Sequence, residues 1–407
     1  MMTQKKALPK DLKTQNYEEI FRSLFERKRF IVSEIVNETG LSRLTVTRAI
    51  NYFLEKQLLV SAGKGSSTNI GGKKPEQYML NGCKYILCVG SNNHGDTYTL
   101  INFTKDIVSS LRKGFATEKT YRQYLADIAW ACDTLLSRHH IPSEDFYGVA
   151  ICTGGVVDSR SGLVSNSTCP QWGERVALAE DVRSVLGRDV VVHVENVAKV
   201  SAGTLRFAEQ VRGKRTAMLY ADYGISIVTL EEGKLTETAH SVVGELGHMC
   251  IDPNDDEVCG CGSKGCFEVL VSERRLVRMI SGMQPESRER LLRGYDGIED
   301  VREYLLREEG RGNPLARPLV EYMAGMIGLA LRNVYLGFDP DQIMIAGAFS
   351  NGSDAFIETI KDRIRENRYL RDIDIDIQLM KRPIIDLLNE GGLNLMLSEY
   401  LEWESKN

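Results

Sequence analysis

The sequence contains no uninterrupted apolar stretch long enough to cross a bilayer, so no membrane segment is expected. Its first residues are basic but are not followed by an apolar core, which argues against a secretory signal peptide. Nine cysteines is an odd number, and outside one short segment they are scattered, which favours a reducing cytoplasm over a disulfide framework. The 407 residues, 43% hydrophobic and 26% charged, are typical of a soluble globular protein with two or three domains.

Charge is unevenly distributed along the chain. Residues 1–80 contain 14 lysines and arginines against 8 aspartates and glutamates, a net charge of +6. The remaining residues have a net charge of −11, which leaves −5 for the whole chain. A basic N-terminal segment on an acidic body predicts that only this segment binds a polyanion.

Three helices are predicted between residues 16 and 60. The first is expected over Tyr17–Arg27, with one buried face formed by Ile20, Leu24 and Phe25. The second, Ser33–Thr39, should begin with its serine as cap and end at the sharp turn of Gly40. Ser42 should cap the third, whose residues spaced for burial are Val46, Ala49, Ile50, Phe53 and Leu54. Helix, glycine turn and capped helix together predict a helix-turn-helix.

Short polar and arginine side chains on the N-terminal half of the third helix suit phosphates and base edges in a DNA major groove. The predicted DNA contacts on this helix are Ser42, Arg43, Thr45, Thr47 and Arg48, with Asn51 on the same half. Two short β segments then flank a loop rich in Gly, Ser and Lys, as in a wing. From it, phosphate contacts are expected from Lys64, Lys73 and Lys74. The alternative is a three-helix protein-interaction module with a solvated basic face.

Residues 244–268 read GELGHMCIDPNDDEVCGCGSKGCFE and contain the pattern H-x10-C-x-C-x4-C. Three thiolates and one imidazole complete the ligand shell of a tetrahedral structural Zn²⁺ site, and they leave no position for a catalytic water. The predicted ligands are His248, Cys259, Cys261 and Cys266. Glycines at 260, 262 and 265 should let the backbone fold tightly around the metal. The alternative is a cluster of reduced cysteines on a loop, and a disulfide between Cys259 and Cys261 would be strained.

From Cys83 onward, strands and helices alternate, which predicts an α/β body with mixed sheets. The expected strands are Tyr85–Gly90, Tyr98–Phe103, Ile107–Leu111, Gly148–Cys152, Val190–Val194, Ala217–Ala221 and Gln342–Ala346. The expected helices are Tyr121–Arg138, Ala198–Phe207 and Leu319–Leu336. No internal repeat is evident in the sequence.

With these pieces placed, the chain resembles the ROK family (repressors, open reading frames, kinases). The resemblance rests on the zinc motif, on GELGH, and on the shorter sequences GGKKP, GGVVD, ENVA and DPDQIMIAG. It implies a two-lobed sugar-kinase, actin-like (ribonuclease H-like) body with a cleft between the lobes, behind a winged helix-turn-helix found only in repressor-type members. The implied domains are residues 1–80 for DNA binding, 81–200 with 385–407 for lobe 1, and 201–384 for lobe 2.

Three elements of the family's kinases are altered in this chain. In the family's kinases, the catalytic base is the aspartate of a motif that resembles E-N-D. In this chain, Val197 occupies the position of that aspartate. The first phosphate loop, similar to D-x-G-G-T in kinases, lacks its acid and its paired glycines between Val89 and Gly95. The second, glycine-rich in kinases, keeps one glycine between Asp222 and Ser226. We therefore predict that the protein is not an enzyme.

The family's sugar-binding positions are better preserved. By the resemblance, a sugar or sugar-derivative effector in the cleft would be bound by Asn196, Glu245, His248 and Glu268, whose polar groups can hold vicinal hydroxyls. The alternative is that these residues serve only as structural groups around the metal. Asn166 and Trp172 lie where the family often has a sugar-facing loop, although a tryptophan is as often part of the core.

The leading interpretation is a transcriptional regulator, most simply a repressor of the xylose or N-acetylglucosamine type. It would bind operator DNA as a homodimer, or as a dimer of such dimers, and release it when an effector changes the lobe arrangement. The alternatives are a sugar kinase that carries a DNA-binding domain, and a regulator that answers to a protein partner instead of a sugar.

Overall fold

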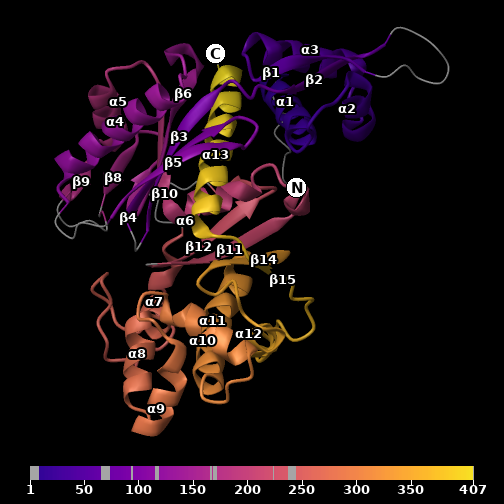
Figure 1. Cartoon of the computed structure of the whole chain (residues 1–407). Coiled ribbons are helices and arrows are strands. Elements are labelled where there is room, and N and C mark those ends of the chain that lie inside the picture. Colours follow the sequence, from indigo (N-terminus) through magenta and orange to yellow (C-terminus); the bar gives the residue numbers. More distant parts are fainter. Residues whose placement is uncertain are drawn as a thin grey trace. The chain divides into compact units, whose positions relative to one another are not determined.

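The computed structural model describes residues 9–65, 74–92, 95–114, 119–165, 167, 172–222, 224–236 and 244–406, and the chain divides into two compact units (Figure 1). Unit 1 comprises Met1–Gln210 and Leu388–Asn407, and unit 2 comprises Val211–Leu387. The N-terminal segment therefore shares a unit with the first part of the body. Among the described residues, no helix combines the length and the apolar character needed to cross a membrane.

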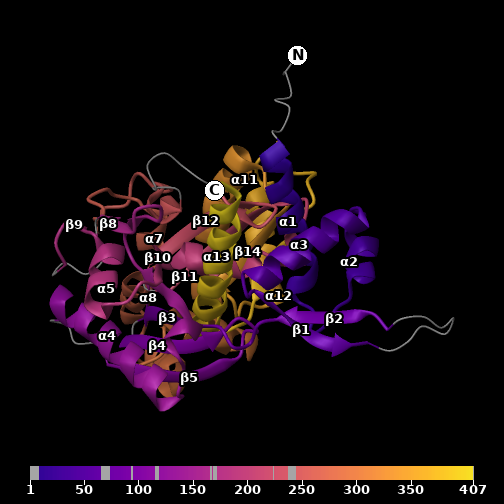
Figure 2. The same cartoon turned by 90° about the horizontal axis from the view of Figure 1, so that it is seen from above.

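Unit 1 begins with three helices and a two-stranded antiparallel hairpin, grouped together in Figure 2. These elements are α1 (Pro9–Phe25), α2 (Val32–Thr39), α3 (Arg43–Glu55), β1 (Leu59–Lys64) and β2 (Glu76–Leu80). We call them the N-terminal module. Its apolar side chains are buried as the spacing predicts, except that Leu54 is only half-buried.

The ends of α2 and α3 test the predicted caps. Ser42 caps α3, because its Oγ accepts a hydrogen bond of 3.1 Å from the Thr45 N–H. Gly40 ends α2 in the left-handed region, with φ of 66°. The prediction for Ser33 is wrong, because α2 begins one residue earlier. Its free N-terminal donor is satisfied instead by Glu34, whose carboxylate accepts from the Ile31 N–H at 3.0 Å.

The body of unit 1 is built on a five-stranded sheet of order β10-β6-β3-β4-β5. Strands β10, β6 and β3 are parallel, and β3, β4 and β5 are antiparallel. The strands are β3 (Tyr85–Asn92), β4 (Gly95–Asn102), β5 (Ile107–Lys113), β6 (Phe146–Thr153) and β10 (Val191–Asn196). The small strands β7 (Val156–Asp158), β8 (Leu163–Ser165) and β9 (Arg175–Val176) form a separate sheet.

Helices cover both faces of the main sheet, because successive strand residues point to opposite sides. Leu87 and Val89 belong to one core cluster with α4 (Tyr121–Arg138) and α5 (Leu178–Leu186). Ile86 and Cys88 face another cluster, which includes α13 (Ile384–Lys406) and the N-terminal module. The predicted bounds of α4 are confirmed, and the predicted helix after β10 is confirmed only as α6 (Val197–Ala202) followed by a 3-10 turn, Gly203–Leu205.

The helix α13 packs closely on α6. A Cβ built on Gly391 would lie 1.8 Å from the Val200 carbonyl oxygen, so no larger residue fits at this crossing. Further along α13, the Asn394 side-chain amide donates to the Gly203 carbonyl at 3.1 Å. The 3-10 turn that begins at Gly203 leads to Arg206, whose side chain contacts α1 of the N-terminal module.

Arg206 joins three parts of unit 1 in the buried interior. Its side chain is 4% exposed, its Nε donates to Ser398 Oγ on α13 at 2.9 Å, and its guanidinium lies 3.5 Å from the Glu18 carboxylate on α1. The neighbouring Phe207 ring packs against Phe21 and Phe25 of α1, with ring centroids 5.1 and 4.7 Å apart. The N-terminal module is therefore held to the body by a shared core that contains a buried ion pair.

Unit 2 contains a second five-stranded sheet, of order β13-β12-β11-β14-β15. Its strands are β11 (Arg215–Ala221), β12 (Ile225–Glu231), β13 (Lys234–Leu235), β14 (Gln342–Gly347) and β15 (Ile377–Met380). One core cluster joins this sheet to helices α7 (Phe267–Leu270), α8 (Glu273–Ser281), α9 (Pro285–Leu291), α10 (Val301–Gly310), α11 (Arg317–Phe338) and α12 (Asp354–Arg365). Every residue of β14 is buried, as in a parallel strand covered on both faces.

The two large sheets have the same design. In each, three antiparallel strands at one edge are followed by two parallel strands, and the strand orders correspond position by position. The body is thus a tandem pair of related α/β units, although the sequence reveals no internal repeat.

Candidate functional site: a Cys3His cluster and its surroundings

The most distinctive group of side chains lies in unit 2, on the segment between β13 and α7. His248 ends a 3-10 turn, Glu245–His248, and Cys266 immediately precedes α7. Cys259 and Cys261 lie on the intervening loop, where Gly262 and Gly265 have positive φ angles of 88° and 70°. A Cβ on Gly265 would lie 2.0 Å from the Asp252 carbonyl oxygen, so this glycine is required for the loop to close. Gly260 has open space around it and no such conformation.

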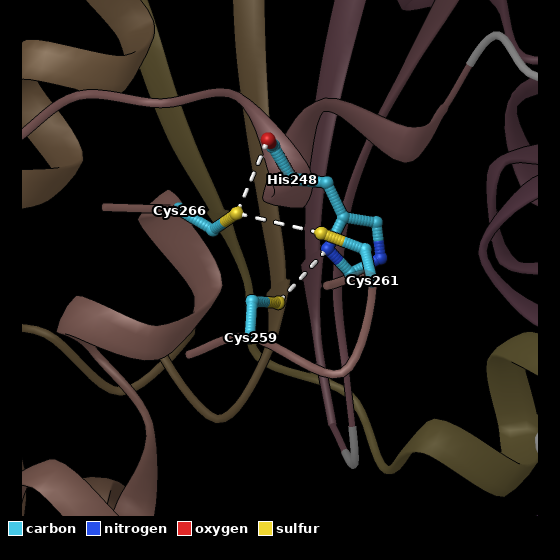
Figure 3. A group of neighbouring side chains, drawn as sticks. All are labelled: His248, Cys259, Cys261 and Cys266. Carbon is cyan, nitrogen blue, oxygen red and sulfur yellow. Dashed lines mark hydrogen bonds between the residues drawn. The ribbon is translucent and has the colours of Figure 1, made fainter. Parts of the chain in front are cut away.

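The four predicted ligands converge, as Figure 3 shows. Their donor atoms all lie within 4.8 Å of one another. Cys259 Sγ is 3.3 Å from His248 Nδ1, and Cys261 Sγ is 3.6 Å from Cys266 Sγ. A tetrahedral ion with metal–sulfur bonds of about 2.3 Å separates its sulfur ligands by about 3.8 Å. The donor set therefore fits a tetrahedral metal ion, and Cys250 is the one neighbouring thiol outside the group within this described segment.

The three thiols have different proton affinities in the protein. The Ser263 backbone N–H lowers the pKa of Cys261 to about 7. Burial raises the pKa of Cys259 and takes that of Cys266 to about 12, with further effects from the neighbouring thiols. A bound cation supplies the positive charge that stabilises three adjacent thiolates.

The imidazole of His248 has two different neighbours. Its Nδ1 faces the cysteines, and its Nε2 lies 3.7 Å from the Glu245 carboxylate. A carboxylate beside the distal nitrogen of a metal-bound histidine orients the ring and selects its tautomer. Both side chains remain about one-third exposed, so they are accessible to a small polar molecule.

Glu268 has a contact that the sequence did not predict. Its Oε2 accepts a hydrogen bond of 2.8 Å from the backbone N–H of Ile225, the first residue of β12. Gly247 also packs closely against this turn. A Cβ built on Gly247 would lie 1.9 Å from the Ile225 carbonyl oxygen, so only glycine allows this approach. Both ends of the Cys3His segment therefore contact the turn at residues 222–225. No spacing rule links two residues 43 positions apart, so only the folded structure reveals this contact.

The turn at residues 222–225 corresponds to the second phosphate loop expected from the sequence. The buried Arg302 donates to the Asp222 carbonyl, and the Asp222 N–H donates to the Gly224 carbonyl at 3.0 Å. The Asp222 amide and carbonyl and the Gly224 carbonyl are thus bonded within the protein. Tyr223, in the same loop, lies outside the described residues, as do residues 93 and 94 of the first phosphate loop.

Asn196 belongs to unit 1 and acts there as a helix cap. Its Oδ1 accepts from the Ala198 N–H at 2.9 Å, and its Nδ2 donates to the Gly155 carbonyl at 2.9 Å. Half-buried Val197 follows as the first residue of α6. Trp172 is 8% exposed, and its ring packs at 4.5 Å from that of Tyr124, so it is a core residue. Asn166 lies outside the described residues.

The predicted DNA contacts occupy the N-terminal module. Arg43 and Arg48 are exposed on α3, Thr47 is half-exposed, and Lys64 and Lys74 are exposed on the hairpin. Ser42 and Thr45 bond to each other through their hydroxyls at 2.9 Å within the helix cap. Lys73 lies outside the described residues.

Two α/β units with matching sheets have the sugar-kinase, actin-like fold, and the second unit carries the Cys3His cluster. The chain belongs to the ROK family, whose family model matches residues 93–380.

Known proteins of two kinds resemble the chain. The xylose repressor of Caldicellulosiruptor bescii is 22% identical over 398 residues, which is 94% of this chain and 96% of that protein. The solved structure of a ROK family transcriptional regulator, a homologue of the Escherichia coli Mlc protein, has a TM-score of 0.74 at 18% identity and covers 97% of this chain and 98% of its own. A ROK family glucokinase from Streptomyces griseus, solved with glucose and AMPPNP, has a TM-score of 0.59 at 23% identity and covers 77% of this chain and 98% of its own.

Proposed function

We propose that this protein is a transcriptional repressor of carbohydrate metabolism, which binds operator DNA through its N-terminal module and a sugar or sugar derivative through its body. The observation that carries the proposal is coverage. The regulators match nearly the whole chain, whereas an almost complete glucokinase accounts for only 77% of it. This difference in coverage supports the interpretation that the N-terminal module is a feature shared with the regulators.

The N-terminal module is proposed to be a winged helix-turn-helix. Its α2 and α3 are joined through the left-handed Gly40, and α3 exposes two arginines near its N-terminal end. The β1–β2 hairpin supplies the wing, with Lys64 and Lys74 exposed beside it. This arrangement, together with the basic charge of residues 1–80, suits a helix in the major groove and lysines on the phosphate backbone.

The Cys3His cluster is proposed to bind a structural Zn²⁺. Four ligands of the preferred types fill a tetrahedral shell, so the ion would organise the segment without binding a substrate. When bound, Zn²⁺ would hold the segment closed and leave His248 Nε2 on the side of Glu245.

The effector is proposed to contact Glu245 and His248, which are accessible in unit 2. Glu268 stays in the proposed set, but one of its carboxylate oxygens already holds the Ile225 amide, so it can offer the other. Asn196 remains a predicted contact in unit 1, where its amide also caps α6.

Absence of kinase activity is part of the proposal. The position of the catalytic base is taken by Val197, whose side chain cannot accept a proton. At the second phosphate loop, the Ile225 N–H donates to the Glu268 carboxylate and is not available to a phosphate.

The effect of the effector on DNA requires a mechanical connection to the N-terminal module. Within unit 1, the core around Arg206, to which α1, α13 and the sheet residues Ile86 and Cys88 contribute, would connect the body to this module. An effector acts through it only if it binds one arrangement of the body more tightly than another. In a homodimer, small movements of two recognition helices would spoil a half-site spacing of about 34 Å.

The repressor proposal predicts specific DNA binding that a sugar reverses. Duplexes selected by the protein from a random library should bind with nanomolar affinity, measured by fluorescence anisotropy, and affinity should fall steeply as salt rises. A panel of monosaccharides and their phosphates should contain one that weakens this binding at least fivefold, the lower range of allosteric coupling at about 1 kcal/mol. Equal affinity for every sequence at every salt concentration would contradict DNA recognition.

The same panel separates the remaining alternatives. The effective sugar, at a hundred times its dissociation constant, should stabilise the protein by about 2.7 kcal/mol in thermal unfolding. Flat calorimetric titrations with every sugar, alongside specific DNA binding, would instead favour a regulator that answers to a protein partner.

The kinase alternative has a direct assay. Protein incubated with ATP, Mg²⁺ and the sugar panel should release no ADP above the rate without protein, because both the base and the phosphate loops are altered. A ROK glucokinase assayed in parallel is the positive control. Sustained turnover with any sugar would contradict the assignment as a pure regulator.

A further inference from the structure

One leucine stands out on the face of α3 that the repressor proposal turns toward DNA. Leu44 is 60% exposed, the most exposed large apolar side chain among the described residues of the N-terminal module. Its neighbours on the same helical face, three, four and seven positions later, are Thr47, Arg48 and Asn51. A single exposed leucine means little alone, but this one lies among the side chains expected to meet the groove.

The fold itself does not require an apolar residue at this position. The capping contact at the start of a helix normally joins the residue before the cap to the fourth helical residue. Those positions are Leu41, which packs on the core, and Val46, which is fully buried. Leu44 is the second helical residue and takes part in neither the cap nor the core.

The charge around Leu44 indicates its partner. Arg43 precedes it and Arg48 follows one turn later, and α3 contains no acidic residue before Glu55. This basic surface suits a polyanion and is unfavourable for a cationic or purely apolar partner. In a major groove, the one apolar group that a base pair presents is the 5-methyl of thymine.

We propose that Leu44 reads a thymine methyl group in each half-site of the operator, and so determines sequence specificity at that base pair. The inference rests on the proposed DNA-binding function. Arg43 and Arg48 would supply charge to phosphates or guanine edges, while Leu44 supplies the apolar contact that distinguishes T·A from the other pairs. Exposure of the side chain in the free protein is explained, because the contact forms only on DNA.

The test removes only the 5-methyl group of thymine, by replacing thymine with uracil in the DNA. Duplexes are first selected from a random library by the wild-type protein, and each thymine of a half-site is then replaced singly by uracil. At one position, uracil should weaken wild-type binding about fourfold per half-site, which corresponds to one buried methyl-sized group at about 0.8 kcal/mol. Leu44→Ala should weaken binding to the thymine duplex by a similar factor or more, and should lose the difference between thymine and uracil at that position.

Two controls keep the experiment specific. Leu12→Ala removes another exposed leucine, on α1 and 49% exposed, and should leave both affinity and the uracil response unchanged. Leu44→Met retains an apolar side chain and should preserve part of the preference for thymine. Affinity for an unselected duplex should be the same for all variants, because phosphate contacts are unchanged.

The possible results are distinct. If the wild type enriches no sequence, the DNA-binding proposal fails and this inference fails with it. If the wild type selects a site but Leu44→Ala retains the full thymine preference, only the role of Leu44 is wrong. If Leu44→Ala instead changes the oligomeric state in sedimentation and leaves the uracil response intact, the leucine is a contact between copies of the chain, which also overturns the inference.

Discussion

Cys259→Ser is expected to lower the free energy of unfolding of the protein by more than about 4 kcal/mol, the range reached when a point substitution removes a metal. Serine is a poor Zn²⁺ ligand, and loss of one of four ligands opens the site. The segment it closes also holds the Ile225 turn through Glu268 and Gly247, so the loss should extend into the β12 edge of the unit 2 sheet. Urea unfolding and metal analysis by mass spectrometry measure both effects.

Cys250→Ser is the matched control. Cys250 lies on the same segment and is exposed, but its sulfur is outside the four-ligand group. This variant should retain one zinc per chain and wild-type stability. Absence of zinc from the wild-type protein, together with wild-type stability of Cys259→Ser, would show that the cluster is an ordinary group of reduced cysteines.

Metal removal also tests the link between zinc and effector. Because His248 offers Nδ1 to the cluster and Nε2 toward Glu245, zinc-free protein should bind the sugar effector at least tenfold more weakly. Normal effector affinity after chelation, in protein that remains folded by circular dichroism, would separate the two sites. The stability result would be unaffected by that outcome.

Arg206→Ala should destabilise unit 1 by about 3–5 kcal/mol, because it breaks a buried ion pair by removing the guanidinium that faces the Glu18 carboxylate. It also removes the bond to Ser398 on α13. Urea unfolding measures the loss, and limited proteolysis should show earlier cleavage in the N-terminal module. Arg317→Ala is the control: its pair with Glu321 is exposed on a helix, so it should cost less than about 1 kcal/mol.

A double substitution distinguishes the buried ion pair from simple packing. Replacing both partners with apolar residues of similar size, Glu18→Leu with Arg206→Met, should recover most of the lost stability, since no charge remains buried. If the double variant is as unstable as Arg206→Ala, the contribution of Arg206 lies in its contact with Ser398 and not in the pair. If Arg206→Ala itself has wild-type stability, the proposed connection between the body and the N-terminal module loses its support.

Local structure followed from the sequence wherever short-range chemistry decides it. Periodicity located α4 with its observed bounds, and capping and turn residues located α3 and the end of α2. Ser33 was wrongly predicted as a cap, because two adjacent residues can satisfy the same free donors, and the carboxylate of Glu34 does so here. A pattern rule cannot separate such competing local solutions.

The matching topology of the two large sheets was not visible in the sequence. Both large sheets have one strand order and one set of strand directions, although their residues differ. A strand position demands only a suitable alternation of buried and exposed side chains, so a topology can persist while sequence similarity disappears. Each predicted strand overlaps an observed strand. The order of the strands within each sheet, however, could not be predicted from the periodicity of the sequence.

The sequence by itself identified the four side chains of the Cys3His cluster, the helix-turn-helix pair α2 and α3, and a valine at position 197, because these depend on residue identity and short spacing, whereas α1 begins at Pro9, eight residues before the predicted start. Only the tertiary structure decided what those residues contact. It placed Glu268 on the Ile225 amide, joined the Asn196 side-chain amide to the Gly155 carbonyl, and buried Arg206 between α1 and α13. These contacts join residues far apart in the chain, and packing of whole elements, not local preference, brings such residues together.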